Sequence, residues 1–332
     1  MKKTLKKIFS LFLRFGISII LLVYIFSKVD RSALLGIIKH VDKVLLLAAF
    51  FVFSLVYLLC LFRWEMLLRA VKIHLSLKRI IISYAGGVFF SLFLPSTIGG
   101  DLVRSIDLGT HTRRPREVVA TVLLDRLSGY VGLVILALLA LIFGWDLIQD
   151  KSVLLAVGAI TTVLITILVV LFNRSVYSVV NRLLHSPNAG KIREAIRNLH
   201  QELHYFRHKK AVIVNNLILS FLIQAIIPVT FYITALSLGI KINILYFFIL
   251  LPVIGAITLL PISIGGLGLR DAATIFFFAK AGVTKDLAFA MSLLNFFFIL
   301  ICAGTGGIIY VLTLHHRRVQ HHQPPPLHTQ HS

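Results

Sequence analysis

The sequence predicts an all-α, polytopic helical membrane protein with about six full membrane spans and two broken segments that contain Pro-Gly-Gly patterns. Three observations lead to this fold class. Of the 332 residues, 58% are hydrophobic and 14% are charged, whereas soluble domains carry about 25% charged residues. Several apolar runs reach the roughly 20 residues that a helix needs to cross a bilayer core. A ten-residue motif also recurs half a chain later.

The full spans are identified by their length and by their low content of charge. They are residues 9–27, 44–62, 118–143, 152–172, 212–237 and 287–314. The first run follows four lysines and could be read as a secretory signal, but no small-x-small cleavage site follows it, so we expect an uncleaved first helix. Cys60 and Cys302 lie inside predicted spans, which favours packing roles over a disulfide framework.

The segment 80–98 ends in Pro and Gly, and charge counting decides how it crosses the membrane. Basic loops mark the cytoplasmic side, and the richest basic loop is residues 173–211. A full crossing at 80–98 would move that loop, and the basic loop before residue 118, to the outside. We therefore predict that 80–98 is re-entrant, entering and returning on the cytoplasmic side. The acidic loop 144–151 then faces outward.

The second broken segment, residues 245–264, is predicted to be re-entrant by the same treatment. The last helix then runs inward, which makes the C-terminus cytoplasmic, like the N-terminus. Within this single transmembrane domain, residues 1–314, the loop 173–211 is cytoplasmic and contains an amphipathic helical pattern, predicted to lie on the inner leaflet or to cap the bundle. Its apolar stripe is Ile192, Ile196, Leu199, Leu203 and Phe206.

The C-terminal residues 315–332 are rich in His and Pro and are predicted to be a disordered tail. No ligand spacing recurs among the tail histidines, so no metal site or cofactor is predicted. The net charge of +21 is dispersed among short loops, so nucleic acid is not an expected partner.

The two broken segments share one motif. Residues 95–104 read P-S-T-I-G-G-D-L-V-R, and residues 261–270 read P-I-S-I-G-G-L-G-L-R. Proline, isoleucine, both glycines and arginine coincide in register. Because three predicted spans separate the copies, the segments enter from opposite sides, as an inverted repeat. Transporters built on inverted repeats bind substrate near the midplane, between broken helices.

Each motif residue has a physical role in this interpretation. The prolines disrupt the preceding helical turn, and the glycines allow positive φ and close approach, so the chain can reverse there. The arginines supply bidentate donors suited to a headgroup phosphate. The alternative is that Pro-Gly-Gly ends helices and the arginines are interfacial anchors.

Two charged residues, Asp125 and Arg126, lie within the span 118–143. Ionisable groups at such depth usually face a protein interior or an aqueous cavity; the alternative is a salt bridge that fixes helix packing. Arg63, at the end of the span 44–62, is ambiguous between an interfacial residue and a headgroup contact. The candidate substrate-binding residues are Pro95, Gly99, Gly100, Asp101, Arg104, Asp125, Arg126, Pro261, Gly265, Gly266, Arg270 and Asp271, and none is assigned a catalytic role.

Three sequence blocks, 95–104, 123–129 and 261–271, resemble the signatures of the lysylphosphatidylglycerol synthase transmembrane region, also called the flippase-like or UPF0104 family. The resemblance covers roughly residues 6–314. In the two-domain synthases of that family this region resembles the lipid-translocating half, and a soluble domain makes the lipid. Nothing here resembles the soluble domain, so synthase activity is not implied. Asp271 stands where the family more often has Glu, which keeps the charge with a shorter reach.

The resemblance and the motif together predict a flippase-like transporter that moves an anionic phospholipid or a lipid-linked headgroup between leaflets of a cell membrane, expected to be a bacterial inner membrane. No enzyme activity is expected. The sequence contains no G-x-x-x-x-G-K-[ST] loop, so net pumping would need an ion gradient, a partner or a downhill lipid gradient. The alternatives are a membrane-embedded transferase, with Asp101, Asp107 and Asp125 as its carboxylates, and a scaffold for a partner lipid-modifying enzyme.

Overall fold

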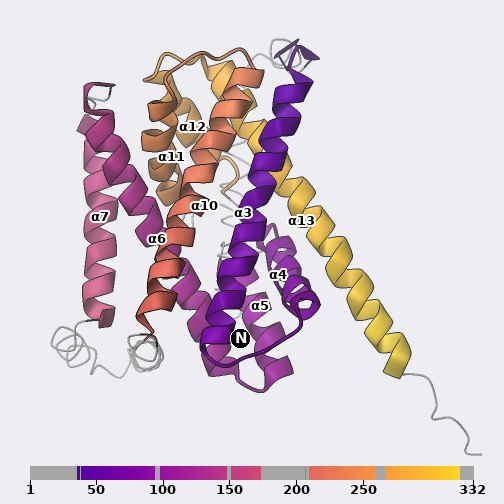
Figure 1. Ribbon diagram of the computed structural model, residues 1–332. Coiled ribbons are helices and arrows are strands. Elements are labelled where there is room, and N and C mark those ends of the chain that lie inside the picture. Colours follow the sequence, from indigo (N-terminus) through magenta and orange to yellow (C-terminus); the bar gives the residue numbers. More distant parts are fainter. Residues whose placement is uncertain are drawn as a thin grey trace, which may run out of the picture.

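The computed structural model describes residues 36–37, 39–93, 98–147, 151–172, 206, 209–258 and 266–321, and this part of the chain is helical and contains no strand. Four helices within it are long and apolar enough to cross a membrane: α3 (Lys43–Ala70), α6 (Pro115–Phe143), α10 (Lys210–Ser237) and α13 (Lys285–His321). Shorter apolar segments lie in α7 (Lys151–Phe172) and α11 (Ile244–Thr258). Figure 1 shows the long helices running between two ends of a bundle.

Four predicted spans coincide with the four long helices except at some ends, and the predicted span 152–172 coincides with α7, whose described apolar segment, Val153–Thr166, is shorter than a full span. The predicted span 9–27 lies outside the described residues, as do the predicted re-entrant turns at 94–97 and 259–265. Helix α3 continues eight residues beyond 62 to Ala70, because residues 63–70 are mostly good helix formers and include neither Gly nor Pro. Helix α13 likewise extends to His321. Residues 315–321, predicted to belong to the disordered tail, are therefore helical, and the first proline lies further on at Pro324.

The first broken segment is a helical hairpin made of α4 (Leu77–Ser91) and α5 (Ile98–Thr112). At its base Arg79 Nη1 lies 2.8 Å from Asp107 Oδ2, and further along the hydroxyl of Ser83 donates to the carbonyl of Arg104 at 3.3 Å. Each arm has 15 residues, about 22 Å of helix, which is shorter than a bilayer core of about 30 Å. The segment therefore returns to the end from which it started.

The glycines of the first motif pack the two arms together. Gly99 and Gly100 lie within α5 and are helical, so the prediction that they adopt positive φ and reverse the chain is wrong. The prediction of close approach is confirmed: a Cβ on Gly100 would lie 2.1 Å from the carbonyl oxygen of Gly87 on α4. Helix α5 begins at Ile98, inside the motif, so both glycines lie within its first turn.

The second broken segment forms a corresponding pair, α11 and α12 (Leu269–Ala279). The rings of Phe247 and Phe278 are 5.0 Å apart, which joins the start of α11 to the end of α12. Gly266 and Gly268 have φ values of 75° and 77°, so the predicted positive φ is found in this copy. Figure 1 shows α11 and α12 at the end of the bundle opposite α4 and α5.

The loops group at the two ends as charge counting predicts. At one end, Arg114 Nη1 donates to the carbonyl of Lys72 at 3.2 Å, and Lys209 Nζ donates to the carbonyl of Ala70. At the other end, the N–H of Asp42 donates to the carbonyl of Ser237 at 3.0 Å. Helix α6 runs from the basic loop before residue 115 to the loop at Gly144, so these two loops lie at opposite ends of the bundle.

Two apolar clusters stabilise these ends. One surrounds α11 and includes the buried Phe247, Val253 and Phe278. The other surrounds the C-terminal part of α3 and includes Trp64 and Phe206. Of the predicted amphipathic stripe, only Phe206 lies among the described residues; it is 1% exposed, which favours a capping role for that position.

Candidate functional site

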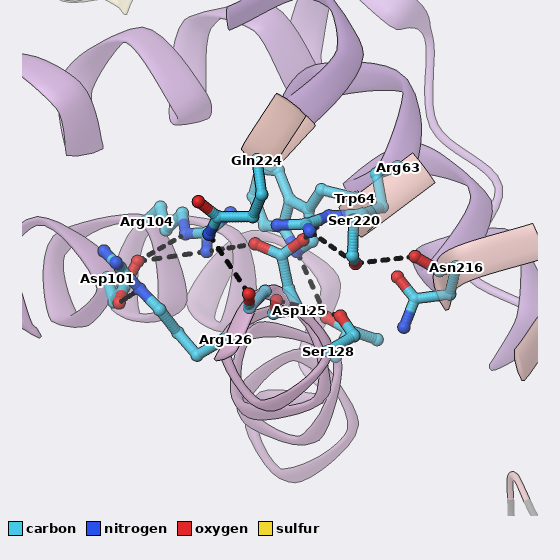
Figure 2. Close-up of polar contacts among 12 residues, drawn as sticks. Arg63, Trp64, Asp101, Arg104, Asp125, Arg126, Ser128, Asn216, Ser220 and Gln224 are labelled. Atoms are coloured by element: carbon cyan, nitrogen blue, oxygen red, sulfur yellow. Dashed lines mark hydrogen bonds and ion pairs between the residues drawn. The ribbon is translucent and has the colours of Figure 1, made fainter. Parts of the chain in front are cut away.

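Five charged side chains from three helices meet inside the bundle (Figure 2). Arg63 comes from α3, Asp101 and Arg104 come from α5, and Asp125 and Arg126 come from α6. Asp125 is ten residues into α6, about 15 Å along the helix axis and close to half of a bilayer core. Charges at such depth are costly unless they are paired.

Asp125 joins α3 to α5 through its two carboxylate oxygens. Oδ1 accepts from Arg63 Nε at 2.7 Å, and Oδ2 accepts from Arg104 Nη2 at 2.9 Å. The three side chains are between 4% and 7% exposed. Asp125 therefore faces the protein interior, and its ion pairs to α3 and α5 also fit the alternative of a salt bridge that fixes helix packing. Arg63 is not the interfacial residue considered above, because α3 continues past it and holds it against Asp125.

Asp101 makes the second junction of the cluster. Its Oδ1 accepts from Arg104 Nε at 3.1 Å, and its Oδ2 accepts from Arg126 Nε. The side chain of Arg126 is 34% exposed, far more than its partners, so this arginine marks the open side of the cluster.

The surrounding residues fix the arginines in place. Arg63 Nη1 donates to the hydroxyl of Ser220 on α10 at 2.7 Å. The guanidinium carbon of Arg104 lies 4.7 Å from the ring centroid of Trp64 and 5.7 Å from that of Tyr84, within the range of cation–π attraction. Gln224 on α10 donates to the carbonyl of Gly129 at 3.1 Å, which joins α10 to α6.

The cluster borders a cavity of about 190 Å³ that is lined by all five charged residues and by uncharged residues of α3, α4, α5, α6 and α10. Three guanidinium groups face two carboxylates there, so one positive charge is in surplus among the described lining residues. Arg104 Nη1 is buried and makes no hydrogen bond within the described part of the chain. A buried polar space of this size holds several waters or a small anionic group.

The second motif builds a different site. Arg270 Nη2 lies 2.9 Å from Asp271 Oδ1, and Arg270 Nε donates to the hydroxyl of Ser292 on α13 at 3.2 Å. The same hydroxyl donates to Asp271 Oδ1 at 2.5 Å. The N–H of Gly268 donates to Asp271 Oδ2 at 3.0 Å, so this carboxylate also caps the start of α12.

The structure thus brings together one part of the predicted site. Gly100, Asp101, Arg104, Asp125 and Arg126 line one cavity. Gly99 precedes Gly100 in α5 and is helical. Arg270, Asp271 and the turn at Gly266 are absent from the described lining of that cavity. Pro95, Pro261 and Gly265 lie outside the described residues.

Sequence reasoning gave too little weight to Arg63 and did not single out Tyr84 or Ser220 as site residues. Arg63 stood at the edge of an apolar run, where an interfacial role is common. The one usable signal was Asp125 within the span 118–143, because a buried carboxylate needs a cationic partner and Arg126, the next residue, does not share its helix face.

These features define a class: a polytopic helical membrane protein with two helical hairpins at opposite ends and an ionic cluster buried between its spans. Residues 11–307 match the family described as the lysylphosphatidylglycerol synthase TM region. The chain therefore belongs to this family, as its three sequence blocks predict.

Two curated relatives are named as membrane proteins of the UPF0104 family. One, from Methanothermobacter thermautotrophicus, is named a UPF0104 membrane protein and is 28% identical over 282 residues, which cover 78% of this chain and 82% of the relative. Another UPF0104 membrane protein, from Pyrococcus horikoshii, is 21% identical over 301 residues, covering 84% of this chain and 89% of the relative. No solved structure matches the chain significantly.

Proposed function

We propose that this protein moves an anionic phospholipid or lipid-linked headgroup between the two leaflets of a membrane, and that the cavity beside Arg104 binds the headgroup phosphate. One observation carries the proposal: the described lining of the cavity includes three guanidinium groups and two carboxylates, and the cavity lies between spans. A surplus positive charge in a low-dielectric interior is costly. An anionic headgroup neutralises that charge and takes up guanidinium donors in the bidentate geometry that suits phosphate.

The arrangement of the hairpins supports transport. The α4–α5 and α11–α12 pairs lie at opposite ends of the bundle (Figure 1), as in transporters whose inverted repeats alternate access to a central site. In this proposal the basic end, which includes Lys72 and Arg114, is cytoplasmic. The α4–α5 pair then enters from the cytoplasm and the α11–α12 pair from the other side.

The direct test is translocation by the purified full chain in liposomes. A fluorescent phosphatidylglycerol is placed in both leaflets, and an impermeant reductant then bleaches the outer one. We expect bleaching to proceed beyond one half with the protein present, faster for phosphatidylglycerol than for zwitterionic phosphatidylcholine. A transferase or a scaffold without transport activity would leave the inner leaflet protected, and that result would contradict the proposal.

The decisive variant is Arg104→Gln. It leaves Arg63 paired with Asp125 and Arg126 paired with Asp101, so it removes the surplus charge without stranding a carboxylate. We expect translocation to slow about tenfold or more, since a hydrogen bond to a charged group contributes about 1.5–3 kcal/mol. The matched control is Arg116→Gln, which replaces an exposed arginine on α6 and should change the rate little.

A further inference from the structure

A second hollow, which we call the apolar groove, lies beside the cavity of the ionic cluster. It has a volume of about 500 Å³ and lies between α6, α7 and α11. Nine of its ten lining residues are aliphatic, and Tyr130 is the tenth. Small side chains on two of the three helices, Ala156, Ala159 and Ala256, leave the space open.

Tyr130 lines both spaces. It follows Arg126 by one helical turn on α6, and the side chains of the two residues hydrogen-bond. One turn further, Leu133 and Val134 line the apolar groove. Because residues three and four apart share a helix face, one face of α6 changes from charged to apolar along the helix axis.

This order matches the order of groups in a phospholipid. The headgroup cavity opens on the side of Arg126, its most exposed charged residue, and the groove begins at the next turn of the same face. Figure 1 shows α7 at the margin of the bundle, so the groove has one wall that meets the surrounding lipid. A volume of 500 Å³ is within the range of ligand pockets, about 300–1,000 Å³.

We propose that the groove between α6, α7 and α11 binds an acyl chain of the same anionic lipid whose headgroup occupies the cavity beside Arg104. This inference rests on the proposed function for the identity of the headgroup. It adds the second part of the substrate: the protein binds a lipid by its chain as well as by its phosphate, and Tyr130 lies where the two parts join. A water-soluble headgroup alone would then be a poor substitute for the whole lipid.

The experiment uses the full chain in liposomes that contain a trace of phosphatidylglycerol with a photoreactive diazirine on one acyl chain. Crosslinked residues are mapped by mass spectrometry. We expect labelling of groove residues such as Ala159 and Ala256, and we expect unlabelled phosphatidylglycerol to compete with it several-fold better than phosphatidylcholine does. Labelling at Ile165, on the opposite face of α7, should show no such preference.

Two tryptophan variants separate this inference from the proposed function. Ala159→Trp fills the groove, and we expect it to lower both the competed labelling and the translocation rate about tenfold. Ile165→Trp adds the same ring at a position that is 54% exposed and should behave like the parent. If Arg104→Gln slows translocation while Ala159→Trp matches Ile165→Trp, the headgroup site stands and the groove assignment is wrong.

The remaining outcomes are also decided. If neither Arg104→Gln nor Ala159→Trp affects translocation, the proposed function fails, and competition in the labelling experiment alone decides the groove. Labelling that is equal at Ala159 and Ile165, with no dependence on the headgroup, would mean that ordinary surrounding lipid fills the groove. That result would overturn the inference.

Discussion

The two hairpins carry the same motif and use it differently. In the α4–α5 hairpin, Arg104 is the seventh residue of its helix and reaches Asp125 on α6. In the α11–α12 pair, Arg270 is the second residue of its helix and contacts its neighbour Asp271. The first arginine joins separate helices, whereas the second stabilises the start of its own helix and the contact with α13.

The difference teaches that a repeated motif supplies a position but not its partner. Helix α6 carries Asp125 opposite the first arginine, and α13 offers the hydroxyl of Ser292 to the second. A hydroxyl cannot balance a guanidinium charge, so the acidic partner of Arg270 must come from within the repeat itself. Under the proposed function, the headgroup chemistry belongs to the first hairpin and a positioning role to the second.

The largest expected difference between the hairpins is the side of the membrane from which their bases are reached. Ser76 precedes α4 and Thr284 precedes α13, directly after the α11–α12 pair, and both residues are exposed. With an impermeant maleimide on intact cells, we expect Thr284→Cys to react and Ser76→Cys to react only after permeabilisation. The parent, with Cys60 and Cys302, gives the background. Reaction of both positions from the same side would contradict the opposed arrangement.

The next comparison is between the two aspartates. Asp125→Asn leaves three guanidinium groups against one carboxylate, and breaking a buried pair costs about 3–5 kcal/mol. We expect a strong decrease of the apparent Tm of the purified protein and loss of translocation. Asp271→Asn should cost less, about 1–3 kcal/mol, because Asp271 pairs with one arginine whereas Asp125 pairs with two. Equal losses would remove the distinction between the sites.

The helical part of this fold follows from local features of the sequence. The length of each apolar run predicts a span, because this signal lies within one segment. The distribution of basic loops along the chain predicts which helix ends lie together. The end of α3 was missed since Arg63, Trp64 and Glu65 end the apolar run without ending the helix. A charged residue changes hydropathy at once, whereas a helix ends only when the backbone can no longer continue.

The site could be predicted only where its residues belonged to the repeated motif or were unusual by themselves. Asp125 was found because a carboxylate within a span needs an explanation. Its pairing with Arg63, 62 residues away, depends on how α3 packs against α6, and no sequence signal gives that packing. The prediction of a turn at Gly100 failed for a related reason. The residue at which α5 starts decides whether this glycine reverses the chain or packs within a helix.

The glycines offer a third comparison. A Cβ at Gly100 would meet the backbone of Gly87 and the hydroxyl of Ser91 at 2.1 and 2.4 Å, so Gly100→Ala should force the α4 and α5 arms apart. We expect a cost of about 3 kcal/mol. Gly266→Ala meets no atom closer than 3.6 Å but requires a left-handed residue at φ 75°, which costs about 1–2 kcal/mol. Apparent Tm values of the two variants test this order.

The control for both glycine variants is Gly158→Ala on α7, where a Cβ would meet nothing within 4 Å. Alanine is the better helix former by about 1 kcal/mol, so this variant should be neutral or slightly stabilising. A Gly100→Ala protein as stable as this control would show that the two arms are not in close contact.

The smallest expected effects come from exchanging each motif arginine for lysine, and they test the comparison most finely. Lysine keeps the charge, so insertion and interfacial anchoring are preserved, but it loses the planar fork. At Arg104 two nitrogens of that fork reach two carboxylates, Nε to Asp101 at 3.1 Å and Nη2 to Asp125 at 2.9 Å, and an ammonium cannot reproduce the geometry. We expect Arg104→Lys to slow translocation about tenfold, equivalent to about 1.4 kcal/mol. At Arg270 a lysine can still pair with Asp271 and face Phe296, so Arg270→Lys should slow translocation about threefold or less.

Parental translocation rates in both lysine variants would make the arginines topological anchors. Equal, large losses would instead return Arg270 to the role of a second headgroup ligand, because only a bidentate contact with substrate would then explain why the charge alone is insufficient.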